Sequence, residues 1–320
     1  MNIKLGLFLS KITETGGIDL HTHSTASDGS YTPEQVMQLA KNNQLKYLAL
    51  TDHDTIQGCL ELIEQYPVLD DFLSEQHPDQ FTLSKCHPNQ VFSSVQYKTQ
   101  NVNYSYPILI PGVELSVIFE NQEIHLLAYY SGQSIKQLDS FLKEQRVKRG
   151  KRNQEMIKRL NQLGIPIPDD ELDPSAEQPV TGRVKVAKWL VANNYVNSIQ
   201  QAFDNYLAEG KPAYVPRQRV ELEYALKLIE QSEGFPVVAH PHQYGWCRNQ
   251  DILTEKITKI AKLTDVGVEA FHSNATPEQQ KMIFLLARKL NLAFTAGSDF
   301  HGINKEDHQL YSFKYKPIVY

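Results

Sequence analysis

The sequence has 320 residues, a length that exceeds the usual single domain and suits one α/β barrel with an insertion, or two domains. Its hydrophobic content of 41% is ordinary for a globular protein, and its net charge of −5 argues against a surface that coats long nucleic acid. No stretch approaches the ~18 apolar residues of a membrane span, and three widely spaced cysteines suggest neither disulfides nor a thiolate zinc site, so we expect no membrane contact and a cytoplasmic protein.

Residues 18–23 form the first predicted strand, which carries the pattern His21-x-His23. Alternate residues of a strand share a face, so the two imidazoles point the same way, about 6.6 Å apart along the chain. The turn-forming segment 24–29 follows, and from it Asp28 can fold back toward the histidines. This spacing suits a metal clamp, although one His-x-His pattern is weak evidence beside the plainer reading of hydrogen-bonded histidines.

The next segments alternate between helix and strand. Thr32 at the N-cap and Pro33 at the first helical position predict the start of a helix. A short apolar strand then ends just before His53, so a second metal-capable side chain follows a strand. The predicted elements of this unit are a helix over 33–43, a strand over 47–51 and a helix over 55–66.

Residues 67–107 break this alternation, because they are rich in Ser, Gln, Asn and Pro, and we interpret them as an inserted excursion. Two apolar strands are predicted after it, over 108–116 and 124–130. Glu114 and His125 interrupt these strands. A buried carboxylate is costly unless it is paired or bound to metal, so Glu114 is a strong candidate for a ligand.

The chain becomes helical from about residue 134 and stays so to about residue 233. Residues 143–159 are strongly basic, which fits either a solvated helix face or a surface that attracts phosphate. Further helices are predicted over 184–193, 199–208 and 222–232. We therefore expect a barrel formed by 1–133 and 234–320, interrupted by a helical subdomain at 134–233.

Strands and helices alternate again in the last part of the chain. His240 follows a predicted strand, and Asp299 and His301 follow the final one. The predicted strands are 235–239, 267–271 and 292–295, and the predicted helices are 252–263 and 277–290.

Nine candidate ligands lie at or near the carboxyl ends of predicted strands. In an α/β barrel these ends converge on one face, where such folds build their active sites. The set is His21, His23, Asp28, His53, Glu114, His125, His240, Asp299 and His301. Six imidazoles and three carboxylates exceed the ligands of one ion, so two or three divalent ions are expected. Mixed nitrogen and oxygen donors suit Mn²⁺, Zn²⁺ or Fe²⁺.

The chain resembles the PHP (polymerase and histidinol phosphatase) superfamily in six segments, HTHSTASDG, LTDHDT, PGVELS, EIHLLAY, AHP and GSDFHG. Two longer segments, VELSVIFENQEIHLL and AFDNYLAEGKPAYVP, and the basic helix are similar to its bacterial branch of RNase AM 5′-to-3′ exoribonucleases and nucleoside 3′,5′-bisphosphate phosphatases. The resemblance covers nearly the whole chain apart from 67–107. It implies a distorted (β/α)7 TIM-like barrel, the PHP fold, with a trinuclear site and an inserted helical subdomain.

The resemblance also implies roles for individual residues. The nine candidates would be the metal ligands, with Mn²⁺ as the expected ion and Zn²⁺ or Fe²⁺ as alternatives. Glu114, which would bridge two ions, Asp299 and His240 would be catalytic. The residues expected to bind substrate phosphate are Arg183, Lys185, Lys211 and His242. Arg183 matches an arginine of the family, whereas Lys185 replaces a histidine and His242-Gln243 replace a Gly-Arg pair.

The sequence thus predicts a metal-dependent phosphoesterase, in which a metal-activated hydroxide attacks a nucleoside 3′,5′-bisphosphate or the end of a short 5′-phosphorylated RNA. A phosphomonoesterase for a non-nucleotide metabolite such as histidinol phosphate is one alternative. A non-catalytic metal-binding or regulatory module is another. The sequence leaves the oligomeric state open.

Overall fold

The structure is a computed structural model that describes residues 3–69, 106–168, 183–216, 220–305, 309–310 and 313. The predicted excursion at 67–107 lies almost entirely outside these residues.

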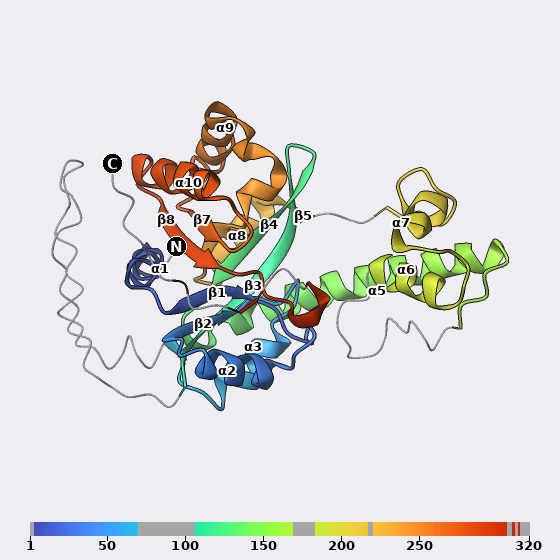
Figure 1. The fold of residues 1–320 in the computed structure, drawn as a ribbon, viewed down its shortest axis with the longest axis horizontal. Coiled ribbons are helices and arrows are strands. Elements are labelled where there is room, and N and C mark those ends of the chain that lie inside the picture. The colour runs from blue at the N-terminus through green and yellow to red at the C-terminus, as the bar shows by residue number, and fades with distance from the viewer. Residues whose placement is uncertain are drawn as a thin grey trace.

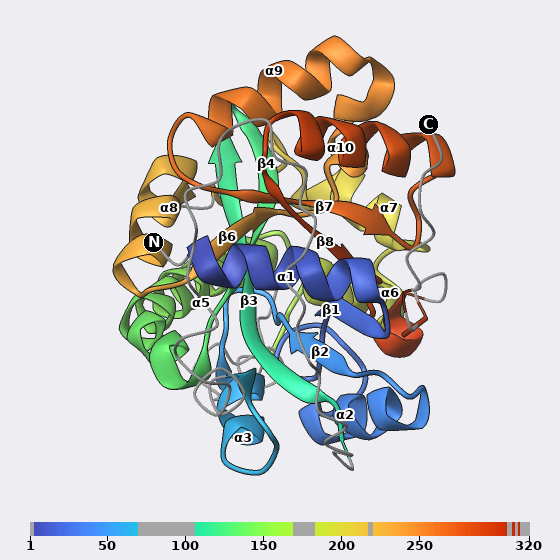
Figure 2. The same cartoon turned by 90° about the vertical axis from the view of Figure 1, so that its left-hand side faces the viewer.

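A nearly closed sheet forms the centre of the molecule (Figures 1 and 2). Seven strands follow one another in the order β1-β2-β3-β4-β6-β7-β8, and the short β5 pairs with β3. The strands are β1 (Ile18–Thr22), β2 (Tyr47–Leu50), β3 (Ile108–Phe119), β4 (Gln122–Tyr129), β5 (Val220–Glu221), β6 (Phe235–Val238), β7 (Gly267–His272) and β8 (Ala293–Gly297).

Most neighbouring strands are parallel, but β4 runs antiparallel to both β3 and β6. A bridge between Thr22 and Phe300 joins the segment after β8 to the end of β1 and brings the two edges of the sheet together. The predicted distorted (β/α)7 barrel is therefore confirmed, and β4 is the strand that distorts it.

Helices pack around the barrel with their apolar faces inward. They are α2 (Pro33–Asn42), α3 (Gln57–Ile63), α8 (Leu222–Gln231), α9 (Gln250–Ala261) and α10 (Pro277–Lys289), with shorter helical turns η2 (Gly132–Leu138), η4 (Pro241–Tyr244), η5 (Trp246–Arg248) and η6 (Gly302–Asn304). The expected N-cap of α2 is present, since Thr32 and Gln35 form a reciprocal capping box. Such a cap satisfies backbone donors that the first helical turn leaves unpaired.

The helix α1 (Ile3–Thr15) was not predicted from the sequence. It buries Leu5 and Leu9 in the barrel core, and Ser10 accepts a hydrogen bond from the backbone N–H of Phe294 at the start of β8. Figure 2 shows α1 lying across the barrel. The helix therefore covers the end where the parallel strands begin and leaves the opposite end for the polar side chains.

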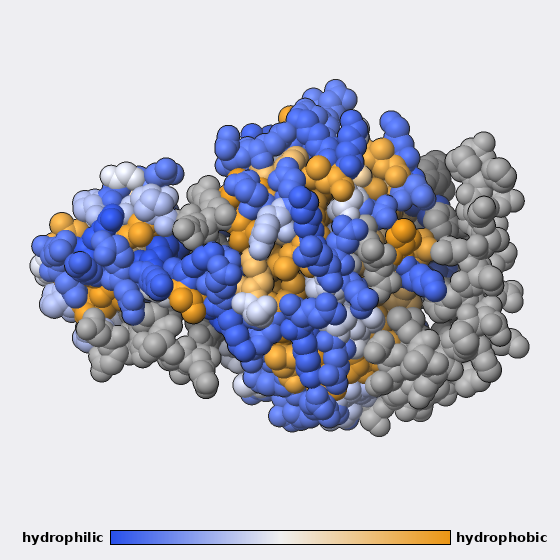
Figure 3. Space-filling model, turned by 180° about the vertical axis from the view of Figure 1, so that it is seen from behind, coloured by the Kyte–Doolittle hydropathy of each residue, from blue (hydrophilic) through white to orange (hydrophobic). Residues whose placement is uncertain are grey.

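The predicted helical block contains α5 (Asp139–Gln162), α6 (Arg183–Ala192), α7 (Ile199–Ala202) and the π-helical turn η3 (Phe203–Leu207). Buried residues that include Leu160 of α5, Leu190 of α6 and Leu207 of η3 form a second hydrophobic core, and we call the part of the chain that surrounds it the helical lobe. Phe141 and Leu142 of α5 and the buried residues of α8 belong to the barrel core. Figure 1 shows α5 running from the barrel to α6 and α7, and Figure 3 shows a mostly hydrophilic surface on this lobe.

The second core is thus narrower than the predicted subdomain at 134–233, whose boundaries remain a prediction. Among the described helices, none has the length and apolar character that a membrane crossing requires.

Candidate metal centre

The nine candidate ligands gather at one end of the barrel. His21 lies in β1, and His53, His240 and Asp299 lie just past β2, β6 and β8. The prediction that all nine lie near the carboxyl ends of their strands is wrong for His125, which lies near the start of β4. Because β4 runs antiparallel to β3, its amino end reaches the barrel end that the carboxyl ends of the parallel strands form.

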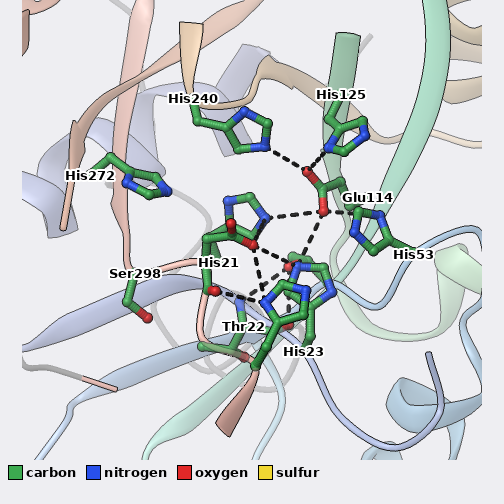
Figure 4. Close-up of polar contacts among 12 residues, drawn as sticks. His21, Thr22, His23, His53, Glu114, His125, His240, His272 and Ser298 are labelled. Atoms are coloured by element: carbon green, nitrogen blue, oxygen red, sulfur yellow. Dashed lines mark hydrogen bonds and ion pairs between the residues drawn. The ribbon is translucent and has the colours of Figure 1, made fainter. Parts of the chain in front are cut away.

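Glu114 stands at the centre of this cluster. Its side chain is fully buried, and β3 carries it three residues beyond the last position paired with β2. Figure 4 shows imidazoles from several strands pointing at its carboxylate. The nitrogen-to-oxygen distances to Glu114 are 2.9 Å from His125, 3.0 Å from His240, 3.1 Å from His53, 3.2 Å from His23 and 3.3 Å from His21.

Two aspartates extend the cluster on either side of His23. Asp299 places Oδ1 3.3 Å from Nε2 of His23 and 3.5 Å from Nε2 of His21. Asp28, which is half exposed, places Oδ1 3.1 Å from Nε2 of His301. Asp28 therefore folds back to the cluster as its turn predicts.

These side chains form three donor groups in which all ligand atoms lie within 4.8 Å of one another. The groups are His21, His23, Glu114 and Asp299; His23, Asp28, His53 and His301; and His53, Glu114 and His125. His23, His53 and Glu114 each belong to two groups, so the groups overlap. His240 joins them through its contact with Glu114.

The donor set fits divalent ions. Buried atoms that face the cluster, including Nε2 of His21, Oε2 of Glu114 and Nε2 of His301, lie close to one another or to other polar atoms, but none makes a hydrogen bond of suitable geometry to a described residue. A buried polar atom without a partner costs about 1–3 kcal/mol, and a bound cation would satisfy several at once. Imidazole and carboxylate donors suit Mn²⁺, Zn²⁺ or Fe²⁺.

Two carboxylates and one imidazole of the cluster are held in the protonation state that binds metal. Burial alone would raise the pKa of Glu114, but the surrounding imidazoles hold it well below its usual range. Burial lowers the pKa of His53 to about 3, so this ring stays neutral and keeps a lone pair for an ion. Asp299 has its pKa held well below its usual range, despite its burial, by His21 and His23. The carboxylates are therefore ionised at neutral pH.

Glu269 of β7 holds two of the candidate ligands, His21 and His240, in position. One of its carboxylate oxygens lies 3.0 Å from Nδ1 of His21, and the other accepts a hydrogen bond of 2.8 Å from the backbone N–H of His240. With its Nδ1 held in this way, His21 turns Nε2 toward Glu114. The sequence analysis missed Glu269, although an acidic residue within an apolar strand is the signal that singled out Glu114.

Two further carboxylates, also missed, fix the loops that bear ligands. Asp52 accepts hydrogen bonds of 2.7 Å from the backbone N–H of Ser24 and 2.6 Å from the hydroxyl of Ser27, beside Asp28. Asp19 accepts bonds from the backbone N–H and the hydroxyl of Ser298, at 2.9 and 2.6 Å, beside Asp299. Burial raises the pKa of Asp19 to about 7.

The backbone bends sharply where ligands leave their strands. His240 and Asp299 have φ angles of 25° and 55°, and Asp54, next to His53, has a φ of 51°. Residues other than glycine rarely adopt this left-handed region, at a cost of order 1–3 kcal/mol each. Such strain is typical of functional sites, where the surrounding structure holds side chains in fixed directions.

The four predicted phosphate contacts lie in two places. Arg183, Lys185 and Lys211 belong to the helical lobe, where the Arg183 guanidinium lies 5.8 Å from the ring centre of Phe203 and Lys185 and Lys211 are exposed. His242 lies two residues after His240, with its ring 4.8 Å from that of His272. The structure thus does not bring the four together, and their role in binding phosphate stays a prediction.

Comparison with known proteins agrees with this arrangement. The family model of the PHP domain matches residues 19–274, a span that holds seven of the nine donors. The 5′-3′ exoribonuclease Rnm of Escherichia coli is 29% identical over 283 residues, which cover 88% of this chain and 84% of that protein. The 3′,5′-nucleoside bisphosphate phosphatase of Chromobacterium violaceum is 27% identical over 89% of this chain and 87% of its own.

A solved structure of an amidohydrolase from Chromobacterium violaceum, with bound sulfate, has a TM-score of 0.65 and 26% sequence identity, covering 94% of this chain and 92% of that one. The barrel and the family model thus lead to the same assignment, which confirms the resemblance found in the motifs. The chain belongs to the PHP domain family and is a metal-dependent hydrolase of phosphate esters.

Proposed function

We propose that the protein hydrolyses phosphate esters of nucleotides, as a phosphatase of 3′,5′-nucleoside bisphosphates and a 5′-to-3′ exoribonuclease on short 5′-phosphorylated RNA. The overlap of the three donor groups through His23, His53 and Glu114 carries this proposal. Groups that share donors would hold their ions close together, and paired ions supply the chemistry of phosphoester hydrolysis. The similarity to an RNA exonuclease and to a bisphosphate phosphatase supports the substrate class.

The proposed cofactor is a cluster of two or three Mn²⁺ ions, and Zn²⁺ or Fe²⁺ would suit the same donors. When bound, the ions supply Lewis acidity and a water of lowered pKa. Glu114 would help to hold more than one ion, because it belongs to two donor groups and its two oxygens face different histidines: Oε1 faces His125 and His240, and Oε2 faces His21, His23 and His53.

Asp299 and His240 are the other residues that we expect to take part in the reaction. Asp299 stays ionised and, with His21 and His23, offers one closely spaced donor set. His240 lies 3.0 Å from Oε1 of Glu114, the oxygen that His125 also contacts at 2.9 Å, and its backbone N–H is held by Glu269. Glu114, Asp299 and His240 are therefore the residues that we propose as catalytic.

A comparison of four substrates tests this function. Metal-loaded protein is assayed with adenosine 3′,5′-bisphosphate, a short 5′-phosphorylated RNA, the same RNA with a 5′-hydroxyl, and histidinol phosphate. We expect turnover of the first two and a clear preference for the 5′-phosphorylated over the 5′-hydroxyl RNA.

The other outcomes select the alternatives. Preference for histidinol phosphate would indicate a phosphomonoesterase for a non-nucleotide metabolite, and tight metal binding without turnover would indicate a regulatory module. Equal rates on both RNAs would contradict recognition of the 5′-phosphate.

We further propose a cytoplasmic location. Cys59 and Cys247 are buried free thiols, as expected in a reducing compartment, and an RNA or nucleotide substrate is found in that compartment.

A further inference from the structure

A cavity of about 370 Å³ lies between α5 and β3. Its apolar lining includes Leu115, Phe141 and Val220, and its basic lining consists of Lys148 and Lys151 together with Arg152 of α5. The volume is within the range of small-molecule sites, and an apolar wall with a few polar groups is typical of them.

The cavity begins at the edge of the metal centre. Asp54, which follows His53, lines it, and so does Ser116, which pairs with His125 across the sheet. Asp54 accepts a hydrogen bond of 3.3 Å from the backbone N–H of Ser116. The residues next to two candidate ligands thus form the barrel wall of the cavity.

The helix α5 forms the opposite wall and is held to the same loop. Arg146 donates a hydrogen bond of 3.5 Å to the hydroxyl of Thr55, one residue after Asp54. The helix α5 leads away from the barrel (Figure 1), and its residues Lys148, Lys151 and Arg152 line the cavity. The fixed start of α5 therefore sets the position of these cations relative to the metal centre.

The charges on the two walls differ. The helix supplies three cations against one carboxylate, that of Asp54, on the barrel wall. Lys148 pairs with Glu144 at 2.7 Å, and the Arg152 guanidinium donates hydrogen bonds of 2.7 and 3.2 Å to Oδ1 of Asn153. Lys151 lies directly before Arg152 in the helix. An anion that enters the cavity is therefore attracted to the helix wall near Lys151.

We propose that this cavity holds the nucleoside of the substrate, and that Lys151, Lys148 and Arg152 bind its 5′-phosphate while its 3′-phosphoester lies at the metal centre. The base would pack against Phe141 and Leu115. The inference rests on the proposed function and adds the residues that recognise the 5′-phosphate. It assigns this recognition to α5 and not to Lys185 or Lys211 of the helical lobe.

The test compares Lys151→Ala and Lys148→Ala with wild-type protein. For each, kcat/KM is measured on a short RNA with a 5′-phosphate and on the same RNA with a 5′-hydroxyl. We expect the ratio of the two values to fall at least about fivefold in Lys151→Ala, because a hydrogen bond to a charged group is lost. Lys158→Ala is the matched control, since Lys158 is an exposed lysine of α5 that does not line the cavity.

A binding measurement separates this role from turnover. Adenosine 5′-monophosphate and adenosine are titrated into metal-free protein by calorimetry. Wild-type protein and Lys158→Ala should bind the monophosphate more tightly than adenosine, and Lys151→Ala should lose most of this difference.

The two hypotheses fail in different ways. If wild-type protein does not distinguish 5′-phosphorylated from 5′-hydroxyl RNA, the proposed function fails. If wild-type protein distinguishes them and Lys151→Ala and Lys148→Ala keep the wild-type ratio, the function stands and the cavity assignment is overturned. Loss of the ratio in Lys185→Ala alone would place the 5′-phosphate in the helical lobe and overturn it as well.

Discussion

Replacing Glu269 with glutamine should weaken metal binding without removing any candidate ligand. The Glu269 carboxylate holds Nδ1 of His21 at 3.0 Å with one oxygen and accepts the backbone N–H of His240 at 2.8 Å with the other. Burial would raise the pKa of this carboxyl, but His21 and neighbouring histidines lower it to about 2, so it is ionised at neutral pH.

The size of the effect follows from these two contacts. Glutamine keeps one acceptor oxygen and loses the charge, so either His21 or His240 loses its partner. Groups that orient a metal ligand in this way typically change metal affinity by about 10–100-fold, which corresponds to roughly 1.4–2.7 kcal/mol. We expect a reduction of that order in the affinity of Glu269→Gln for Mn²⁺.

The assay is calorimetric titration of metal-free protein with Mn²⁺, with thermal unfolding to show that the variant is folded. Glu255→Gln is the control, because Glu255 is an exposed residue of α9 that pairs with Lys259 at 2.6 Å, away from the donor groups. A folded Glu269→Gln protein with the metal affinity of wild type would refute the claim that Glu269 positions His21.

Chelation of divalent ions should abolish hydrolysis and lower the melting temperature, because ions that bind only the folded state stabilise it. Addition of Mn²⁺ should restore activity, and addition of Mg²⁺ alone should not. Gly297→Ala should destabilise the protein by about 1–3 kcal/mol and lower its metal content, because an added Cβ would collide with the side chain of His21. Denaturant unfolding measures the stability, and metal analysis measures the metal content. Thr276→Ala removes the cap of α10, so it should cost about 1 kcal/mol of stability and leave the metal content unchanged; a change in metal content would contradict the separation of the cap from the site. Burial raises the pKa of Cys59 to about 12 and that of Cys247 to about 11, so neither thiol should react with iodoacetamide at pH 8 until the protein unfolds, as peptide mapping would show.

The sequence was enough to predict the candidate ligands, because each signal is local. His21 and His23 show their common face through strand alternation, and His53, His240 and Asp299 follow apolar runs that are easily recognised as strands. Barrel geometry then brings residues of distant segments to the same end. A local pattern combined with one rule of topology therefore gave most of the donor set.

The features that the sequence did not reveal depend on direction and on partners. The direction of the strand predicted over 124–130 was not used, so His125 was grouped with the ligands at carboxyl ends, although it lies near the start of β4 and β4 runs antiparallel to β3. A buried acid in a strand can bind an ion, as Glu114 is placed to do, or hold a neighbour, as Glu269 does, and only the contacts distinguish the two roles. The helix α1 lacks any motif and is recognised only once Leu5 and Leu9 are seen in the core.

The distribution of carboxylates explains how one end of a packed barrel can bury so many polar groups. Glu114 and Asp299 belong to the donor groups. Glu269 and Asp52, which we call the outer carboxylates, instead accept hydrogen bonds from backbone N–H groups and side chains that position the ligands. The outer carboxylates therefore need no ion, whereas Oε2 of the buried Glu114 makes no hydrogen bond to the described residues. A site built in this way keeps its ligands aimed before the ions arrive, at the expense of stability in the metal-free protein. The end covered by α1 carries no such cost, because its contacts are made by apolar residues such as Leu5 and Phe8.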